Sequence, residues 1–312
     1  MNNKFLLGFL VIFSSFVFYS CTKDDIAEVG TQPSDFGVRF ALSNPSVIEA
    51  DPVTGLFTLT VLRNGAGDAL DVPVSAVSDE DNMFSVPASI HFDAGQDTTY
   101  LTVSMPTSAP LGEQYKLSIK IDDAYSNPYL LDGSSVYSVS ASLSIWKNIG
   151  FAEYYDDFVY GGTFVFQLPF DQSLVDPTMY RIAYPYSDEI MIATGNDDEW
   201  MGGQTQLNVV YTVTADDHVT WAKFWYTHLI YYGNDGQEIK AYLPSALATS
   251  LKDDDALSIV GERDGDGNIL YLELHPYYYI DGVGGYGDSY AVYVGFPGYD
   301  LAGALGYPLY EP

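Results

Sequence analysis

Short runs in which apolar and polar residues alternate recur through residues 36–147 and indicate β-strands. Turn-forming pairs such as Asn44-Pro45 and Asn64-Gly65 break these runs, and no long stretch has the period of a helix. The strands predicted in this way cover residues 38–42, 56–62, 72–77, 89–92, 99–105, 115–121 and 136–145. Their spacing predicts an immunoglobulin-like β-sandwich of about seven strands.

Residues 148–312 again contain short apolar runs and predict a second, mostly antiparallel β domain, so the expected fold class is mainly β. The predicted strands cover residues 164–168, 179–183, 207–214, 219–232, 239–243, 269–274 and 290–294. One short helix is expected at 245–251, where Pro244 precedes the apolar residues. Most of the 27 tyrosines fall after residue 150, which marks a change of composition between the two domains.

The first twenty residues have the pattern of a secretory signal. Lys4 precedes an uninterrupted apolar run at 5–13, which is shorter than the roughly 20 residues that span a bilayer. Phe18-Tyr19-Ser20-Cys21 then resembles a lipobox, the motif in which a signal peptidase cuts before a lipidated cysteine. Cys21 is the only cysteine of the chain, so no disulfide within the chain competes for it. We expect acyl chains on Cys21, with residues 1–20 as the lipoprotein signal peptide.

The residues that follow Cys21 indicate where the protein is displayed. Lys23-Asp24-Asp25 resembles the export signal of Bacteroidota lipoproteins, which implies the outer face of the outer membrane. Residues 21–35 are then the lipidated cysteine and a flexible tether, followed by domains at 36–147 and 148–312. The lipid anchor would be the only membrane contact, and an outer-membrane transporter or other surface lipoproteins are candidate partners.

The charge of the chain restricts its ligands. Forty-two acidic residues against 12 basic ones give a net charge of −30, which repels nucleic acid and polyanionic glycans. Neutral or cationic ligands remain compatible with this charge. The chain is also 47% hydrophobic, so its acidity does not predict disorder.

The first domain resembles Calx-beta and related immunoglobulin-like domains at residues 46–51, 57–63, 90–96 and 112–117. The resemblance implies that calcium could bind between loops, with Glu49, Asp122 and Asp123 at matching positions. However, Pro106-Thr107-Ser108 stands where the family has an aspartate pair. A spacer sandwich without calcium is therefore our preferred interpretation.

One further segment has acidic residues at a metal-like spacing. Asp264-Gly265-Asp266-Gly267-Asn268 opens like an EF-hand loop, but His275 occupies the position of the bidentate glutamate. The same residues are typical of a β-hairpin turn. We expect the hairpin and no resident cofactor, and the alternative is that Asp264 and Asp266 are metal ligands.

Aromatic residues in the second domain are candidates for ligand binding. With the period of a strand, Trp221, Lys223, Trp225, Thr227 and Tyr231 share one face, while Phe224, Tyr226 and Ile230 share the other. The two tryptophans would stand about 13 Å apart on an extended strand, near the span of two to three sugar rings. Tyr271 and Tyr278 form a second aromatic patch. The alternative is that all these rings fill the core.

Residues 150–157, 180–186 and 277–287 resemble modules of surface lipoproteins from glycan-foraging Bacteroidota. We therefore expect a non-catalytic protein that binds oligo- or polysaccharides through its second domain. The first alternative is a structural or adhesive protein with a protein partner, and the second is a glycoside hydrolase. Neither a zinc-binding HExxH motif nor a Gly-x-Ser-x-Gly nucleophile elbow occurs in the sequence.

Overall fold

The computed structural model describes residues 35–201, 208–230, 236–287 and 290–311 and is mainly β, as predicted. Cys21, Lys23, Asp24, Asp25 and Tyr231 lie outside these residues. The chain divides into two compact units. The first comprises residues up to Ala50, Gly55–Pro106 and Gln114–Ala141, and the second comprises Asp51–Thr54, Thr107–Glu113 and residues from Ser142 onward.

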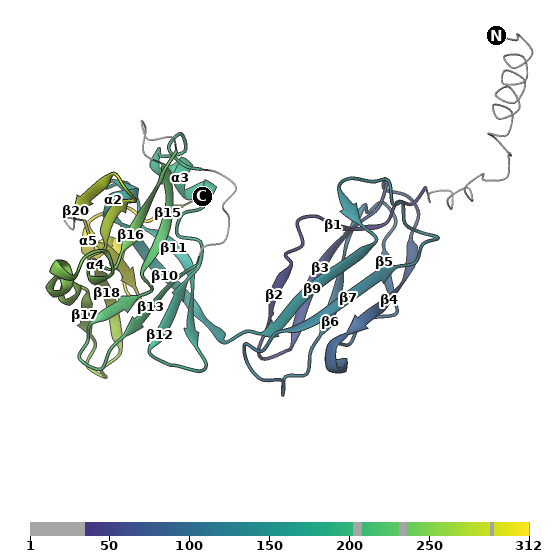
Figure 1. The fold of residues 1–312 in the computed structure, drawn as a ribbon, viewed down its shortest axis with the longest axis horizontal. Coiled ribbons are helices and arrows are strands. Elements are labelled where there is room, and N and C mark those ends of the chain that lie inside the picture. The colour runs from purple at the N-terminus through teal and green to yellow at the C-terminus, as the bar shows by residue number, and fades with distance from the viewer. Residues whose placement is uncertain (1–34, 202–207, 231–235, 288–289, 312) are drawn as a thin grey trace, which may run out of the picture. The chain divides into compact units, whose positions relative to one another are not determined.

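The first unit contains two antiparallel sheets (Figure 1). One has the strand order β6-β3-β1-β8 and the other β2-β9-β7-β4-β5. The bounds are β1 (Arg39–Ala41), β2 (Val47–Ala50), β3 (Leu56–Leu62), β4 (Leu70–Asp79), β5 (Ser89–Phe92), β6 (Thr98–Ser104), β7 (Tyr115–Ile121), β8 (Gly133–Ser134) and β9 (Val136–Leu143), with a short 3₁₀ helix, η1, at Glu80–Asn82.

Alternation along the strands explains this sandwich. Phe57, Leu59 and Val61 of β3 are buried, and the threonines between them face outward or are half-buried. Burial of one face of each strand removes apolar surface from water at about 25 cal/mol per Å². The prediction of a β-sandwich-type fold is confirmed.

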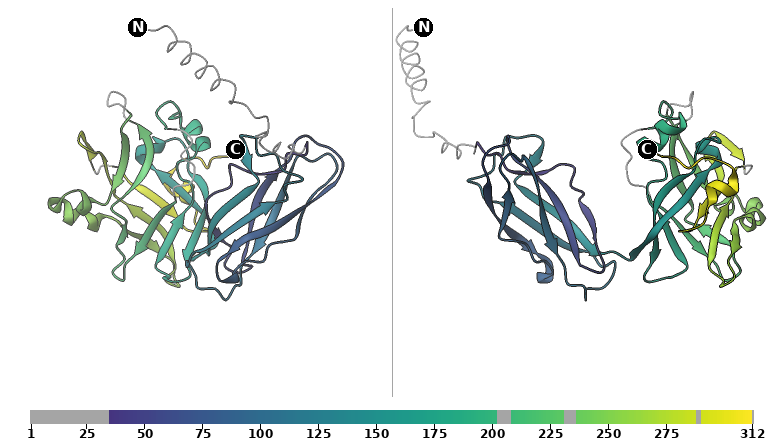
Figure 2. Two further views of the ribbon diagram at one scale, coloured as in Figure 1. Left: turned by 45° about the vertical axis from the view of Figure 1, so that its right-hand side comes forward. Right: turned by 180° about the vertical axis from the view of Figure 1, so that it is seen from behind.

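The second unit is built on an eight-stranded antiparallel sheet in the order β14-β13-β12-β11-β10-β21-β18-β17. Its two outermost strands also meet, because His218 and Ile259 form a β-bridge and the backbone N–H of Val219 donates to the carbonyl of Ser258 at 2.8 Å. The sheet therefore closes on itself around the core (Figures 1 and 2). The bounds are β10 (Trp146–Asp156), β11 (Phe166–Ser173), β12 (Met179–Ile182), β13 (Val209–Val213), β14 (Val219–Trp221), β17 (Ile259–Arg263), β18 (Ile269–Leu274) and β21 (Val292–Gly295).

A second, four-stranded sheet in this unit has the order β15-β16-β19-β20. Its strands are β15 (Phe224–Ile230), β16 (Glu238–Tyr242), β19 (Tyr277–Ile280) and β20 (Gly284–Gly287). The helices of the unit are α2 (Asp157–Tyr160), α3 (Asp188–Thr194), α4 (Pro244–Leu247), the 3₁₀ helix η2 (Thr249–Leu257) and α5 (Leu301–Leu305). No helix among the described residues is long and apolar enough to cross a membrane.

The second unit departs from the predicted elements in three places. Residues 219–232 do not form one strand, because the chain leaves β14 at Trp221 and begins β15 at Phe224 in the other sheet. The expected helix at 245–251 is divided between α4 and η2. The predicted boundary at 147–148 lies inside β10, where Trp146 already pairs with Ser173 of β11.

Candidate functional site

The outward side of the β15-β16-β19 sheet presents aromatic residues in two cross-strand rows. Phe224, Tyr242 and Tyr277 pair across one row, and Tyr226, Lys240 and Tyr279 pair across the next. We call these six residues the aromatic face. Trp225, Ala241 and Tyr278 alternate with them and are buried on the inward side.

Contacts between neighbouring rings hold the aromatic face together. The ring centroid of Phe224 lies 5.1 Å from that of Tyr226 and 5.0 Å from that of Tyr242. The Tyr242 and Tyr279 centroids are 6.0 Å apart in an edge-to-face arrangement. Tyr242 is buried, whereas the other four rings of the face keep partial contact with solvent. The rings therefore form a surface whose shape is set by packing.

Gly285 on the neighbouring strand β20 leaves room for two of these rings. A Cβ at this position would lie 2.5 Å from a ring carbon of Tyr277 and 3.1 Å from a ring carbon of Tyr279. The first distance is shorter than real contacts allow. The absence of a side chain at Gly285 thus lets both rings lie across β20.

A charged pair lies beside the rings. Nζ of Lys240 is 4.7 Å from the Phe224 ring centroid and 5.5 Å from that of Tyr226, within the range of cation–π interaction. The same ammonium donates to Oδ2 of Asp281 at 2.6 Å, and the Tyr242 hydroxyl donates to Oδ1 of Asp281 at 2.6 Å. The bonds from Lys240 and Tyr242 lower the pKa of Asp281. Asp281 is therefore a fixed, ionised acceptor at the edge of the face.

A second polar pair follows on β15 and β16. Nδ1 of His228 lies 2.8 Å from Oε1 of Glu238, and the same oxygen accepts the His228 backbone N–H at 3.0 Å. His228 has a φ of 59°, an uncommon conformation for a residue with a side chain, at a register shift of β15. Its ring stacks on Tyr226 at 6.0 Å. This bulge ends the regular part of the aromatic face.

The prediction that Trp221 and Trp225 form an exposed platform is wrong. Only 8% and 7% of their surfaces are exposed, and their ring centroids are 5.1 Å apart rather than spread along one strand. The physical reason is that the segment crosses between two sheets, so the tryptophans face the core. The residues that the sequence analysis placed on the opposite side, Phe224 and Tyr226, face outward instead.

The other predicted ligand-binding tyrosines do not join the aromatic face. Tyr278 is fully buried. Tyr271 is half-buried on β18, where its ring stacks on Tyr299 at 5.4 Å. The pattern of the sequence alone did not predict Lys240, Asp281 and Tyr242 as site residues. The alternation of polar Glu238 and Lys240 with apolar Ile239 and Ala241 was the signal that could have indicated an outward face on this strand.

Tyr278 instead belongs to a buried polar network around Asp156, at the end of β10. Oδ1 of Asp156 accepts the Tyr278 hydroxyl at 2.8 Å and caps α2 through two backbone N–H groups. Oδ2 accepts the Tyr186 hydroxyl at 2.8 Å, and Tyr186 in turn accepts Nε1 of Trp225 at 2.8 Å. Burial raises the pKa of Asp156 to about 6, against the opposing effect of these hydrogen bonds. The network joins the closed sheet to the small sheet.

The candidate calcium residues are not gathered at one point. Among the described residues, no group of three histidine, cysteine or carboxylate side chains could hold a metal ion. Asp122 accepts the backbone N–H of Ala124, and Asp123 pairs with Lys120 at 2.7 Å. Glu49 lies on β2, separated from β7 by β9.

The second acidic segment is a turn. Oδ1 of Asp264 accepts the backbone N–H groups of Asp266 and Asn268 between β17 and β18, which is the hairpin that the sequence predicted. Hydrogen bonds from Asn268 lower the pKa of Asp264.

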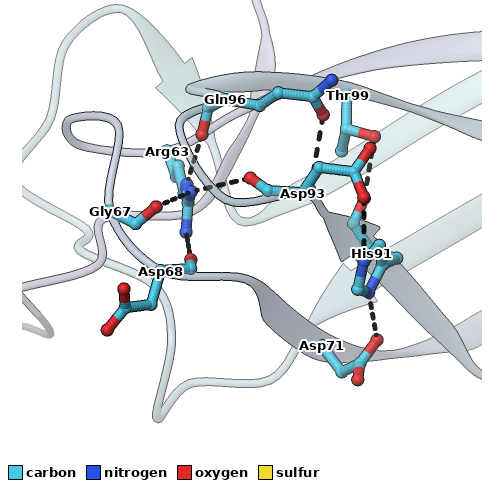
Figure 3. Close-up of polar contacts among 8 residues, drawn as sticks. All are labelled: Arg63, Gly67, Asp68, Asp71, His91, Asp93, Gln96 and Thr99. Atoms are coloured by element: carbon cyan, nitrogen blue, oxygen red, sulfur yellow. Dashed lines mark hydrogen bonds and ion pairs between the residues drawn. The ribbon is translucent and has the colours of Figure 1, made fainter.

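A buried arginine holds the loops at one end of the first unit (Figure 3). The guanidinium of Arg63 donates to the backbone carbonyls of Gly67, Asp68, Asp93 and Gln96 at 2.7–3.3 Å. Its centre also lies 5.1 Å from the Phe92 ring. Nearby, His91 pairs with Asp71 at 2.8 Å, which raises the pKa of the imidazole. Arg63 thus satisfies four carbonyls and serves the fold.

No family model matches the chain, and no curated protein matches it. Several solved structures show a distant similarity. A protein of unknown function from Bacteroides ovatus is 10% identical, with 83% of this chain and 92% of that chain covered and a TM-score of 0.28. A multidomain protein from the same organism is 11% identical over 83% and 92%, with a TM-score of 0.26.

A third Bacteroides ovatus protein, provisionally assigned as carbohydrate-binding, is 12% identical. The similarity covers 79% of this chain and 90% of that chain, with a TM-score of 0.25. At TM-scores this low the similarities assign neither a fold nor a function to the chain.

Proposed function

We propose that the second unit is a non-catalytic module that binds neutral glycans on its aromatic face. The observation that carries the proposal is the arrangement of partly exposed rings in two cross-strand rows around the Lys240–Asp281 pair. Aromatic rings pack against the C–H faces of pyranose rings, and charged hydrogen-bonding groups bind the hydroxyls. A binding site generally combines an apolar surface with a few placed polar groups in this way.

The dimensions of the face suit a short stretch of saccharide. Neighbouring strands lie about 4.8 Å apart, so three strands present a surface roughly 10 Å across. Residues two apart along a strand are separated by about 6.6 Å, which is the distance between the two rows. Phe224 and Tyr226 on β15 would thus contact one side of the bound saccharide, and Tyr277 and Tyr279 on β19 the other.

Charge favours a neutral ligand. The chain has a net charge of −30, which repels polyanions over the whole surface. Within the site, Lys240 is neutralised by Asp281 at 2.6 Å, and Nζ of Lys223 lies 5.8 Å from the Tyr242 ring centroid. The preference for a neutral ligand therefore rests on the charge of the whole chain.

Binding can be tested with the purified protein by affinity electrophoresis and isothermal titration against neutral polysaccharides. Phe224→Ala and Tyr226→Ala should each weaken binding by about tenfold, since each removes one stacking ring worth roughly 1 kcal/mol or more. Tyr100→Ala is the matched control, because Tyr100 is 67% exposed on β6 of the first unit. Absence of binding to every glycan, or equal binding by all four proteins, would contradict the proposal.

The same experiments separate this proposal from its alternatives. Tyrosine and phenylalanine are also frequent in protein interfaces. A protein partner recovered from intact cells through the aromatic face, without any affinity for carbohydrate, would favour an adhesive role. Release of reducing sugar by the purified protein would instead indicate a glycoside hydrolase.

We also propose that Cys21 carries the lipid anchor and that Lys23-Asp24-Asp25 directs the protein to the cell surface. The support is the apolar run before Cys21 and the position of the charged residues directly after it. Two or three acyl chains hold a protein stably on a membrane, at about 0.8 kcal/mol per buried CH₂. Cys21→Ala should abolish labelling with radioactive palmitate. Protection of the wild-type protein from protease added to intact cells would contradict surface display.

A further inference from the structure

The Asp281 carboxylate has acceptor capacity left over. Each of its oxygens accepts one hydrogen bond, from Lys240 and from Tyr242. A carboxylate has about four lone-pair sites, so two remain for a ligand. The side chain of Asp281 is 58% exposed, which leaves these sites open to solvent. Its two internal bonds fix its orientation before any ligand arrives.

Lys240 is the matching donor. Its ammonium has three N–H groups, one of which is used by Asp281. The side chain is only 17% exposed and lies against Phe224 and Tyr226, so its position is restricted. A strong donor and a strong acceptor therefore stand side by side at the edge of the aromatic rings.

The spacing of the two groups corresponds to a particular ligand feature. Nζ of Lys240 and Oδ2 of Asp281 are 2.6 Å apart, and hydroxyl oxygens on adjacent carbons of a pyranose are separated by about one hydrogen-bond length. Each hydroxyl can both donate and accept. We infer that Lys240 and Asp281 form a recognition site for a vicinal diol, in which one hydroxyl donates to Asp281 while its neighbour accepts from Lys240. The inference rests on the proposed function, because the rings would hold the sugar to which the diol belongs.

This site would distinguish glycans by their linkage. Within a 1,4- or 1,6-linked chain, every hexopyranose keeps free hydroxyls on adjacent ring carbons. Within a linear 1,3-linked chain, the linked oxygen separates the free hydroxyls, and no adjacent pair remains. A site built to bind a hydroxyl discriminates strongly against a ligand that lacks it, because its polar groups are then left without partners. The ligands of the aromatic face are therefore neutral glycans whose residues keep a free vicinal diol within the chain, as 1,4- and 1,6-linked chains do and linear 1,3-linked chains do not.

The test uses three neutral probes: dextran, which is 1,6-linked, glucomannan, which is 1,4-linked, and a linear β-1,3-glucan. Affinity electrophoresis of the full-length protein should show retardation by dextran or glucomannan and at least tenfold weaker retardation by the β-1,3-glucan. Asp281→Asn, which keeps the shape of the side chain, should weaken binding of the retarding probe by about tenfold. Lys240→Met should do the same. Asp266→Asn, an exposed change of the same kind in the β17–β18 hairpin, should leave binding unchanged.

The outcomes separate the inference from the proposed function. Equal retardation by the β-1,3-glucan, or unchanged binding by both Asp281→Asn and Lys240→Met, would overturn the diol site. If Phe224→Ala still weakened binding in that case, the proposed function would stand. If neither these probes nor any other neutral polysaccharide bound, both would fall. Melting temperatures of the variants identify any that fail to fold, and Tyr242→Phe then serves as the second variant, since it removes one bond to Asp281 and keeps the ring.

Discussion

The buried Asp156 should make the stability of the protein depend on pH in a defined window. Its pKa in the folded protein is about 6, because burial disfavours the ionised form. In the unfolded chain an aspartate has a pKa near 3.9. A difference of about two units corresponds to on the order of 3 kcal/mol in the free energy of unfolding.

The sign of the effect follows from proton binding. Between about pH 4 and pH 6 the folded state holds the Asp156 proton more tightly than the unfolded state does. The stabilisation from this proton is therefore complete below pH 4 and is lost as the pH rises through 6. At neutral pH the ionised carboxylate remains buried, supported by Tyr186, Tyr278 and the α2 backbone.

Asp156→Asn isolates this contribution, because the amide keeps the shape and does not titrate. The free energy of unfolding should be measured by urea denaturation from pH 4 to pH 7.5 for the wild type and for this variant. The wild type should lose on the order of 3 kcal/mol relative to the variant over this range. Asp266→Asn, at an exposed position, controls for the titration of the other carboxylates. A wild-type-minus-variant difference that stays constant across the range would refute the reasoning.

Three further predictions concern single side chains. Arg63→Met should destabilise the first unit by about 2–4 kcal/mol, since four loop carbonyls lose the hydrogen bonds from the buried, charged guanidinium, and urea denaturation measures the loss. Trp225→Phe should lower the free energy of unfolding by about 1–2 kcal/mol, because it removes the hydrogen bond from Nε1 to the Tyr186 hydroxyl. A loss below about 0.5 kcal/mol in urea denaturation would contradict that role. Gly285→Ala should displace the Tyr277 ring and weaken glycan binding by about tenfold, and titration with dextran or glucomannan checks this.

Some strands could be predicted from the sequence because one of their faces is exposed to solvent and the other is buried. Residues 56–62, 89–92 and 115–121 were predicted as strands and are β3, β5 and β7 with the same bounds. In β7, Tyr115, Leu117 and Ile119 face the core. The polar residues between them make the period of two visible without any knowledge of the partner strand.

The orientation of the small sheet's side chains could not be predicted in the same way. In residues 219–232 both alternating sets are aromatic, so the period predicts a strand but does not say which set faces the core. The interruption between β14, which ends at Trp221, and β15, which begins at Phe224, decides which set faces the core. It places β15 in the small sheet, whose inner side packs on the Asp156 network. Asp281 could not be assigned to the site either, because it follows β19 and meets Lys240 only after 41 residues of chain have folded back.

The sequence by itself determined the mainly β fold, the alternating strands of the first unit and the hairpin at Asp264, since each depends on residues that are close along the chain. Only the tertiary structure decided that the eight-stranded sheet of the second unit closes on itself and that Phe224 and Tyr226, rather than the tryptophans, face outward. It also brought Lys240, Tyr242 and Asp281 together. These features depend on which strands pair and in which register, and that choice is made by burial over the whole unit rather than by local pattern.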